Sequence, residues 1–310
     1  MRTLWSLQGS IAHRSGVLYV GRHARTARIA SFDLDGRRLE SGFTFRDTDM
    51  GRSSVDGLAA DDDHRLWVAD GAACRVRAFS LFGREVVTLG DPLSLDSDRR
   101  GQLGRPVALA VEGTDDDLVL AVVSGGRRRH AVQLMHPATG RTLSLRPDGD
   151  PEGLFQSAVR VRLDDGSVAV LESGRRRIQV FEDGNFHYAL DLPGAREEVP
   201  TSFERMPDGR IVVALDCAPG APGGLHLLDR AGRPQGRLDL EEPLVHPADL
   251  ALIPGDDDAS TRVCVIDRDG ERVLQFNLEG RAYGSFPTLD ATGIHEPVAD
   301  LSPDLLGSEG

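Results

Sequence analysis

The chain has 310 residues, 40% of them hydrophobic, which is enough to bury a large core, and no apolar run approaches the ~18–20 residues that a membrane-spanning helix needs. Its formal net charge of −13 argues against general adhesion to nucleic acid or to anionic membranes. The three cysteines are odd in number and show no Cys-x-x-Cys spacing, so we expect neither a disulfide framework nor a zinc–cysteine site.

The N-terminal segment, residues 1–19, contains Arg2 and Arg14 but no continuous apolar stretch and no clear cleavage site. A secretory signal peptide has both of these features. Together with the cysteine count, their absence predicts a cytoplasmic protein.

All 36 basic residues are arginine, because the sequence contains no lysine. A genome of high GC content favours arginine codons and would explain this without any function. Avoidance of a nucleophilic amine would explain it too, because lysine is the target of acylation and of ubiquitin-like conjugation. The sequence leaves both explanations open.

A short strand pattern recurs six times, at intervals of 47 to 55 residues. Its copies occupy residues 28–32, 75–79, 130–134, 177–181, 224–228 and 272–276. Each copy follows an apolar strand, at 17–20, 66–69, 118–121, 168–171, 211–214 and 263–266. Each copy also precedes a turn that contains glycine, which supplies the positive φ of a tight hairpin. A period in the forties with several short strands per repeat predicts the blades of a β-propeller.

The second repeat carries the most specific pattern: the strands 66–70 and 75–79, followed by Phe82-Gly83, resemble the NHL repeat. The stretch 168–181 resembles it too. The residues Asp70, Asp216 and Asp267 match the family's acid at the end of the second strand, and Glu172 replaces it conservatively. The resemblance covers nearly the whole chain and implies an all-β, six-bladed β-propeller that forms a single domain over residues 1–310. It implies little about function, because the family includes lyases, RNA binders, signalling domains and scaffolds.

The innermost strand of each blade precedes the apolar one. Five of these strands are expected to begin near Val55, Pro106, Gln156, Pro200 and Pro247. For the sixth we expect residues 295–302, so that blade 1 combines residues 10–45 with 295–302 and blades 2–6 occupy 54–290. The N- and C-terminal strands would then close one blade and remove the sheet edges that an open arc leaves.

The loops sort by charge when they are assigned to the two faces of a propeller. Turns between the first and second strands carry the acidic residues 61–63, 115–117, 164–165, 208 and 256–258. Loops between the second and third strands, on the opposite face, carry Arg22, Arg25, Arg127, Arg128, Arg129, Arg175, Arg176 and Arg268. Acidic tight turns are ordinary, because aspartate hydrogen-bonds its own backbone.

Candidate residues for chemistry lie where the innermost strands begin, at the channel mouth: Asp56, Arg105, His246, His295 and Glu296. His246 and His295 would come from adjacent blades, and imidazole with carboxylate can hold Zn²⁺. A third equivalent histidine is missing, and no nucleophile elbow or phosphate-binding loop is present. We therefore expect no catalytic residue, no metal and no cofactor.

The arginine runs 127–129 and 175–176 exceed what the repeat requires. The planar guanidinium donates two parallel hydrogen bonds to carboxylate or phosphate. We therefore predict a non-enzymatic scaffold that binds an acidic protein or a phosphate-bearing partner through these arginines. Two alternatives are a metal-dependent lyase or hydrolase at the channel mouth and a binder of single-stranded RNA. The RNA alternative is weakened because no aromatic residue accompanies the arginine runs.

Overall fold

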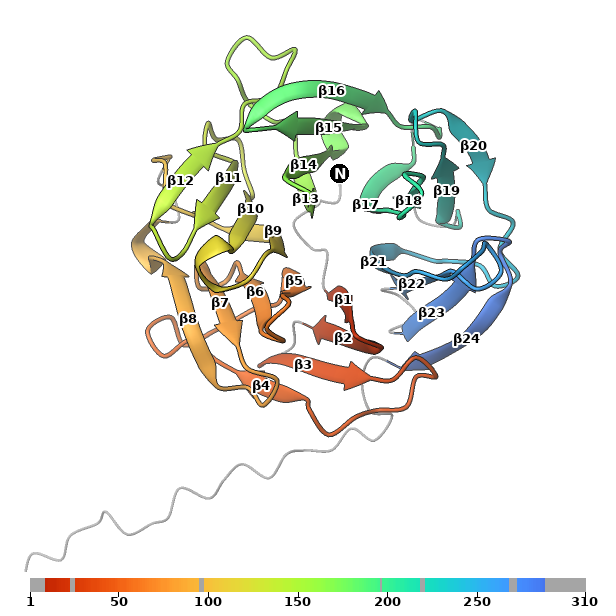
Figure 1. Ribbon diagram of the computed structural model, residues 1–310, viewed down its shortest axis with the longest axis horizontal. Helices are drawn as coiled ribbons and strands as arrows, with labels where there is room; N and C mark the ends of the chain where they lie inside the picture. Colours follow the sequence, from red (N-terminus) through yellow and green to blue (C-terminus); the bar gives the residue numbers. More distant parts are fainter. Residues whose placement is uncertain are drawn as a thin grey trace, which may run out of the picture.

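A computed structural model describes residues 9–22, 26–94, 98–195, 197–217, 221–267 and 272–287. The strands form six four-stranded antiparallel sheets, which are arranged as blades around a common centre (Figure 1). The prediction of an all-β, six-bladed propeller is confirmed. The described part of the chain has only short 3-10 helices, at Pro92–Ser94, Asp115–Asp117 and Ser173–Arg175, and no helix there has the length and apolarity of a membrane span.

Each blade contributes one strand to each of four concentric positions. The innermost strands are β1 (Ser10–Arg14), β5 (Gly57–Ala60), β9 (Pro106–Glu112), β13 (Ala158–Asp164), β17 (Val199–Arg205) and β21 (Pro247–Ile253). The second strands are β2 (Val17–Arg22), β6 (Leu66–Asp70), β10 (Val119–Ser124), β14 (Ser167–Glu172), β18 (Ile211–Asp216) and β22 (Arg262–Asp267). The third strands are β3 (Ala27–Phe32), β7 (Arg75–Phe79), β11 (Val132–His136), β15 (Arg177–Glu182), β19 (Gly224–Leu228) and β23 (Arg272–Asn277). The outermost strands are β4 (Phe43–Phe45), β8 (Glu85–Gly90), β12 (Arg141–Ser144), β16 (Asn185–Asp191), β20 (Pro234–Arg237) and β24 (Ala282–Pro287).

Blade 1 differs from the expectation, because its innermost strand is β1. This strand pairs with β2, from Ser10 opposite Gly21 to Arg14 opposite Val17, and it contacts the innermost strands β5 and β21 of the neighbouring blades. The position that we assigned to residues 295–302 is therefore held by the N-terminal segment, and residues 295–302 lie outside the described part of the chain. The signal that was overlooked is the turn Ser15-Gly16, where both residues have positive φ, as a two-residue hairpin requires.

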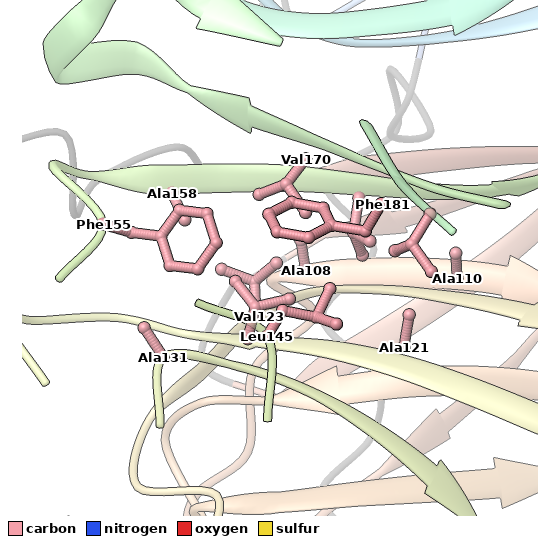
Figure 2. Packing of buried hydrophobic residues seen from close by; sticks show 13 residues of the cluster. Ala108, Ala110, Ala121, Val123, Ala131, Leu145, Phe155, Ala158, Val170 and Phe181 are labelled. Atoms are coloured by element: carbon pink, nitrogen blue, oxygen red, sulfur yellow. The ribbon is translucent and has the colours of Figure 1, made fainter. Parts of the chain in front are cut away.

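Apolar clusters fill the spaces between neighbouring blades. Figure 2 shows the one between blades 3 and 4, where Phe155 and Phe181 pack among small residues such as Ala108 and Ala121. Blade 6 packs against blade 1 in the same way, with the rings of Phe32 and Phe286 4.6 Å apart between centroids. Both faces of each sheet are thus covered, which explains why the second strands are apolar throughout rather than alternating.

Candidate functional site

Two faces of the ring carry the loops. We call the connection face the one formed by the loops between second and third strands, such as 71–74, 125–131 and 173–176, together with the connections between blades. We call the turn face the opposite one, formed by the turns between first and second strands, such as 61–65 and 206–210, and by the hairpins between third and fourth strands. The structure therefore places Arg22, Arg127, Arg128, Arg129, Arg175 and Arg176 on the connection face, as the propeller assignment requires, whereas Arg25 and Arg268 lie outside the described residues.

Three buried carboxylates at the ends of second strands fix the start of the innermost strands. The Asp70 carboxylate accepts the backbone N–H of Ser54 at 2.9 Å, and the Glu172 carboxylate accepts that of Gln156 at 2.6 Å. Asp267 accepts the N–H of His246 at 2.9 Å. These backbone groups have no strand partner, so the acid of the repeat serves the fold rather than chemistry.

Asp216 does not share this role, although the sequence pattern matches it. In blade 5 Pro200, the second residue of the innermost strand, lies opposite Leu215, whereas Pro247 of blade 6 lies opposite Asp267. The carboxylate of Asp216 is thus one residue further along and is only partly buried. It hydrogen-bonds the ring Nδ1 of His246 at 2.7 Å.

The described channel-mouth candidates lie at two separate places, Asp56 with Arg105 at one and His246 at the other. Asp56 accepts hydrogen bonds from the Ser54 hydroxyl and, at 3.0 Å, from the backbone N–H of Gly71, and the Arg105 guanidinium lies 3.8 Å away, so this pair joins blades 2 and 3. His246 pairs with Asp216 between blades 5 and 6. His295 and Glu296 lie outside the described residues. Within the described ranges no three His, Cys, Asp or Glu side chains gather as a metal site.

The arginine runs are divided between the interior and the solvent. Arg128 is buried and donates to the carbonyl of Leu103 at 3.2 Å. The backbone of Arg176 is in the left-handed region, with a φ of 52°. Its guanidinium donates to the carbonyl of Pro193 at 2.7 Å and to that of Glu198.

Arg175 also has partners within the fold. Its guanidinium donates to the carboxylate of Asp150 at 2.7 Å and lies 3.7 Å from that of Glu172. Arg128, Arg175 and Arg176 exceed what the repeat requires, but the fold nevertheless uses them. They bind carbonyls and carboxylates of the connections between blades, which no strand pattern reveals.

Arg127 and Arg129 are exposed. Arg127 pairs with Glu152 at 2.6 Å, but both side chains remain largely in solvent, with exposures of 71% and 60%. The backbone N–H of Arg129 binds Asp98 at 3.0 Å, which brings the connection between blades 2 and 3 against this loop.

That connection carries Arg99 and Arg100, both exposed, which the sequence analysis did not single out. The sequence does mark them, because the two arginines are adjacent and lie in the longest interval between repeats. We call Arg99, Arg100, Arg127 and Arg129 the basic patch. Among the described residues, only Arg127 of these four has an acidic partner for its side chain.

The centre of the ring is occupied by a buried ion pair. The Asp249 carboxylate of β21 accepts the Nε–H of Arg160 from β13 at 3.0 Å and the hydroxyl of Ser202 from β17 at 2.7 Å. Its other oxygen accepts the hydroxyl of Ser10 from β1 at 2.6 Å. Burial by itself would raise the pKa of Asp249, but Arg160 and Arg162 together with the hydroxyls of Ser10 and Ser202 hold that pKa below its ordinary value.

A second pair lies next to the first. The Nε–H of Arg162 donates to Glu204 at 2.7 Å, and its remaining donors bind the carbonyls of Val161 at 3.0 Å and Leu250 at 3.5 Å. Burial raises the pKa of Glu204 in spite of this guanidinium. These groups satisfy edges of the innermost strands that have no further strand to pair with, so they hold the blades together around the centre.

Comparison with solved structures supports the fold. The shared feature is the six-bladed propeller. A crystal structure of a nidogen/laminin complex contains a chain that is 17% identical, with a TM-score of 0.61 over 87% of this chain and 92% of that one. Virginiamycin B lyase from Staphylococcus aureus is 12% identical, with a TM-score of 0.58 over 90% of this chain and 83% of that one. A protein of unknown function from Bacteroides caccae is 13% identical, with a TM-score of 0.58 over 87% and 92%. No protein-family model and no curated protein matches the chain.

Proposed function

We propose that this propeller is a non-enzymatic binding protein and that the basic patch on its connection face binds an acidic protein surface or a phosphate-bearing partner. The observation that carries the proposal is the gathering of four exposed arginines, Arg99, Arg100, Arg127 and Arg129, in a chain whose net charge is −13. Two segments that are distant in sequence supply them, and the bond from Arg129 N–H to Asp98 joins the segments.

The positive charge of the basic patch is largely unmatched within the described part of the chain. Like charges that are close together repel, and of these four side chains only that of Arg127 binds a carboxylate of the described fold, that of Glu152. A guanidinium in solvent binds carboxylate and phosphate through paired hydrogen bonds, and it attracts an acidic partner over a distance that salt shortens. The patch is therefore suited to salt-sensitive recognition.

The surroundings of the patch favour a protein partner over single-stranded RNA. Exposed aromatic side chains on which bases could stack are, among the described residues, Phe82, Phe186, Tyr188 and Tyr283. They belong to a hairpin of the turn face and to outermost strands, away from the patch. A propeller of this fold also occurs in the nidogen/laminin complex, which supports protein binding as a use of the architecture.

The test replaces the four arginines of the patch with serine. We expect capture of the partner from an extract of the native host, at physiological salt, to fall at least tenfold, while the thermal midpoint changes little. The matched control replaces four exposed arginines in the hairpins of the turn face, Arg37, Arg84, Arg141 and Arg233, and so removes the same charge. Equal capture by the patch variant and the wild-type protein would refute the proposal, and equal loss in both variants would show only a general charge effect.

A second candidate function is a metal-dependent lyase or hydrolase with its site at the mouth between blades 5 and 6. The observation in its favour is the buried ring of His246, oriented by Asp216 at 2.7 Å. One solved structure of similar fold is described as a catalytically inactive histidine-to-alanine variant of virginiamycin B lyase. Metal analysis of the purified protein and of His246→Ala decides the matter. Stoichiometric metal that this substitution removes would favour the enzyme, and we expect none.

A further inference from the structure

A cavity of about 110 Å³ opens on the turn face between blades 4 and 5. It extends from the innermost strands, at Arg162 and Glu204, to the outermost strand of blade 4, at Tyr188 and Leu190. Its floor is apolar and is formed by Ile178, Val180, Leu190, Phe203 and Ile211. We call this feature the 4–5 cleft.

The space exists because one position in blade 4 is small. Ala169 lies in the wall of the cleft, three residues before the buried acid that ends its strand. At the same position of blade 2 stands Trp67, which is 1% exposed and fills the corresponding gap, with its indole N–H bonded to Asp61 at 2.8 Å. Between blades 3 and 4 the gap is filled by Phe155 and Phe181 (Figure 2).

The charges along the cleft leave one cation unmatched. At the inner end Arg162 is paired with Glu204 and also bonded to backbone carbonyls. Further out, Arg205 of blade 5 is bridged to Asp164 of blade 4 at 2.9 Å. At the outer end the exposed Arg230 has no ion pair or hydrogen bond with any described residue.

Asp208 does not neutralise Arg230. The charge of Arg230 contributes to lowering the pKa of Asp208, but the Asp208 carboxylate already accepts the Nε–H of Arg210 at 2.6 Å. Arg210 in turn binds Asp258 of blade 6, so the three groups form their own network. The cleft therefore combines an apolar floor with one available guanidinium at its outer end.

We propose that the 4–5 cleft binds a small amphipathic carboxylate, with its apolar group between the blades and its carboxylate against Arg230. An apolar cavity of about 150 Å³ accommodates benzene, so this smaller space suits a branched alkyl group of roughly four carbons, with a phenyl group as the upper limit of size. Arg230 is the natural anion partner, because guanidinium binds carboxylate through two parallel hydrogen bonds. Tyr188 lines the same cleft. The inference is independent of the basic patch, which lies on the opposite face.

The test uses 3-methylbutanoate and phenylacetate as probes and follows the methyl resonances of isotopically labelled isoleucine, leucine and valine. We expect both probes to shift the resonances of Ile178, Val180, Leu190 and Ile211 in a saturable way. The corresponding neutral amides should bind at least fivefold more weakly, because they lack the charge that Arg230 recognises.

Two variants locate the binding. Arg230→Ser should weaken the carboxylates about tenfold, whereas Arg233→Ser, in the same hairpin but outside the cleft, should bind them like the wild-type protein. Ala169→Leu should block the cleft, and its methyl spectrum reports directly whether the fold survives.

Two results would overturn the inference: methyl shifts that occur only outside the cleft or not at all, or binding by Arg230→Ser that equals that of the wild-type protein. Since Arg230→Ser changes an exposed hairpin residue, it keeps the test decisive even if Ala169→Leu disturbs the packing between the blades.

Discussion

The two arginine runs are alike in sequence, yet their side chains meet different surroundings. Arg128 and Arg176 turn inward to carbonyls of Leu103, Pro193 and Glu198, which lie in connections between blades. Such carbonyls have no strand partner, and burying them without a hydrogen bond costs free energy. The guanidinium groups of these arginines therefore supply the hydrogen bonds that a neighbouring strand would otherwise donate to these carbonyls.

This division makes a prediction about single substitutions. Arg128→Ser and Arg176→Ser should each lower the free energy of unfolding by about 1–3 kcal/mol. The first removes a buried guanidinium and one of the two donors to the Leu103 carbonyl, and the second removes the side-chain donor to the carbonyls of Pro193 and Glu198. Arg129→Ser, at an exposed position with no side-chain partner among the described residues, should stay within about 0.5 kcal/mol of wild type. Urea unfolding at neutral pH measures all three. Equal effects at positions 128 and 129 would contradict the distinction between buried and exposed arginines.

At the scale of elements, β1 decides how the ring closes. It pairs with β2, touches β5 and β21, and places Ile11 in the apolar cluster between blades 1 and 6. A closed ring leaves no open edge between blades, so the strand contributes to both neighbouring interfaces as well as to its own sheet.

Deletion of residues 1–14 should therefore reduce stability several-fold more than the ~1 kcal/mol of an average substitution, and the truncated protein should aggregate. Deletion of residues 295–310 is the matched comparison, because it tests the closure that the sequence first suggested. Thermal unfolding and size-exclusion chromatography report on both. A greater loss of stability from the C-terminal deletion would indicate that residues 295–302, and not β1, close the ring.

At the scale of the whole molecule, the Arg160–Asp249 pair joins strands of blades that are not neighbours in the ring. Breaking a buried pair by removing one partner is strongly destabilising, because the other charge remains buried. Asp249→Asn should therefore cost about 3–5 kcal/mol at pH 7.

The same pair predicts a pH dependence. The folded-state pKa of Asp249 lies below the ordinary value of 3.8, so its contribution to stability is complete above that value. The contribution is lost as the pH falls from about 3.8 through the folded-state pKa, since protonation then favours the unfolded chain. The difference in unfolding free energy between wild type and Asp249→Asn should thus be constant from pH 7 to 5 and shrink below 4. A difference that stays constant down to pH 2.5 would show that protonation of Asp249 is not coupled to unfolding.

The sequence by itself determined the class of the fold, the number of blades and the positions of most second and third strands. These features rest on signals within one repeat: apolar strands, glycine in the hairpins and a fixed spacing. Even the two faces of the ring followed from them, because strand order dictates where each loop emerges. The one shifted third strand, β11, begins at Val132 instead of His130, because the N–H groups of Arg129 and His130 bind Asp98 from a preceding connection.

Only the tertiary structure decided which of the candidate residues are available for function. The bond from Ser10 to Asp249 joins residues 239 positions apart, and the partners of Arg128 and Arg176 lie 25 and 22 positions away in irregular segments. No local pattern encodes such contacts, because each depends on how two blades are oriented once the ring has closed. The same holds for the 4–5 cleft, where the small side chain of Ala169 leaves space only because its neighbour across the interface does not fill it.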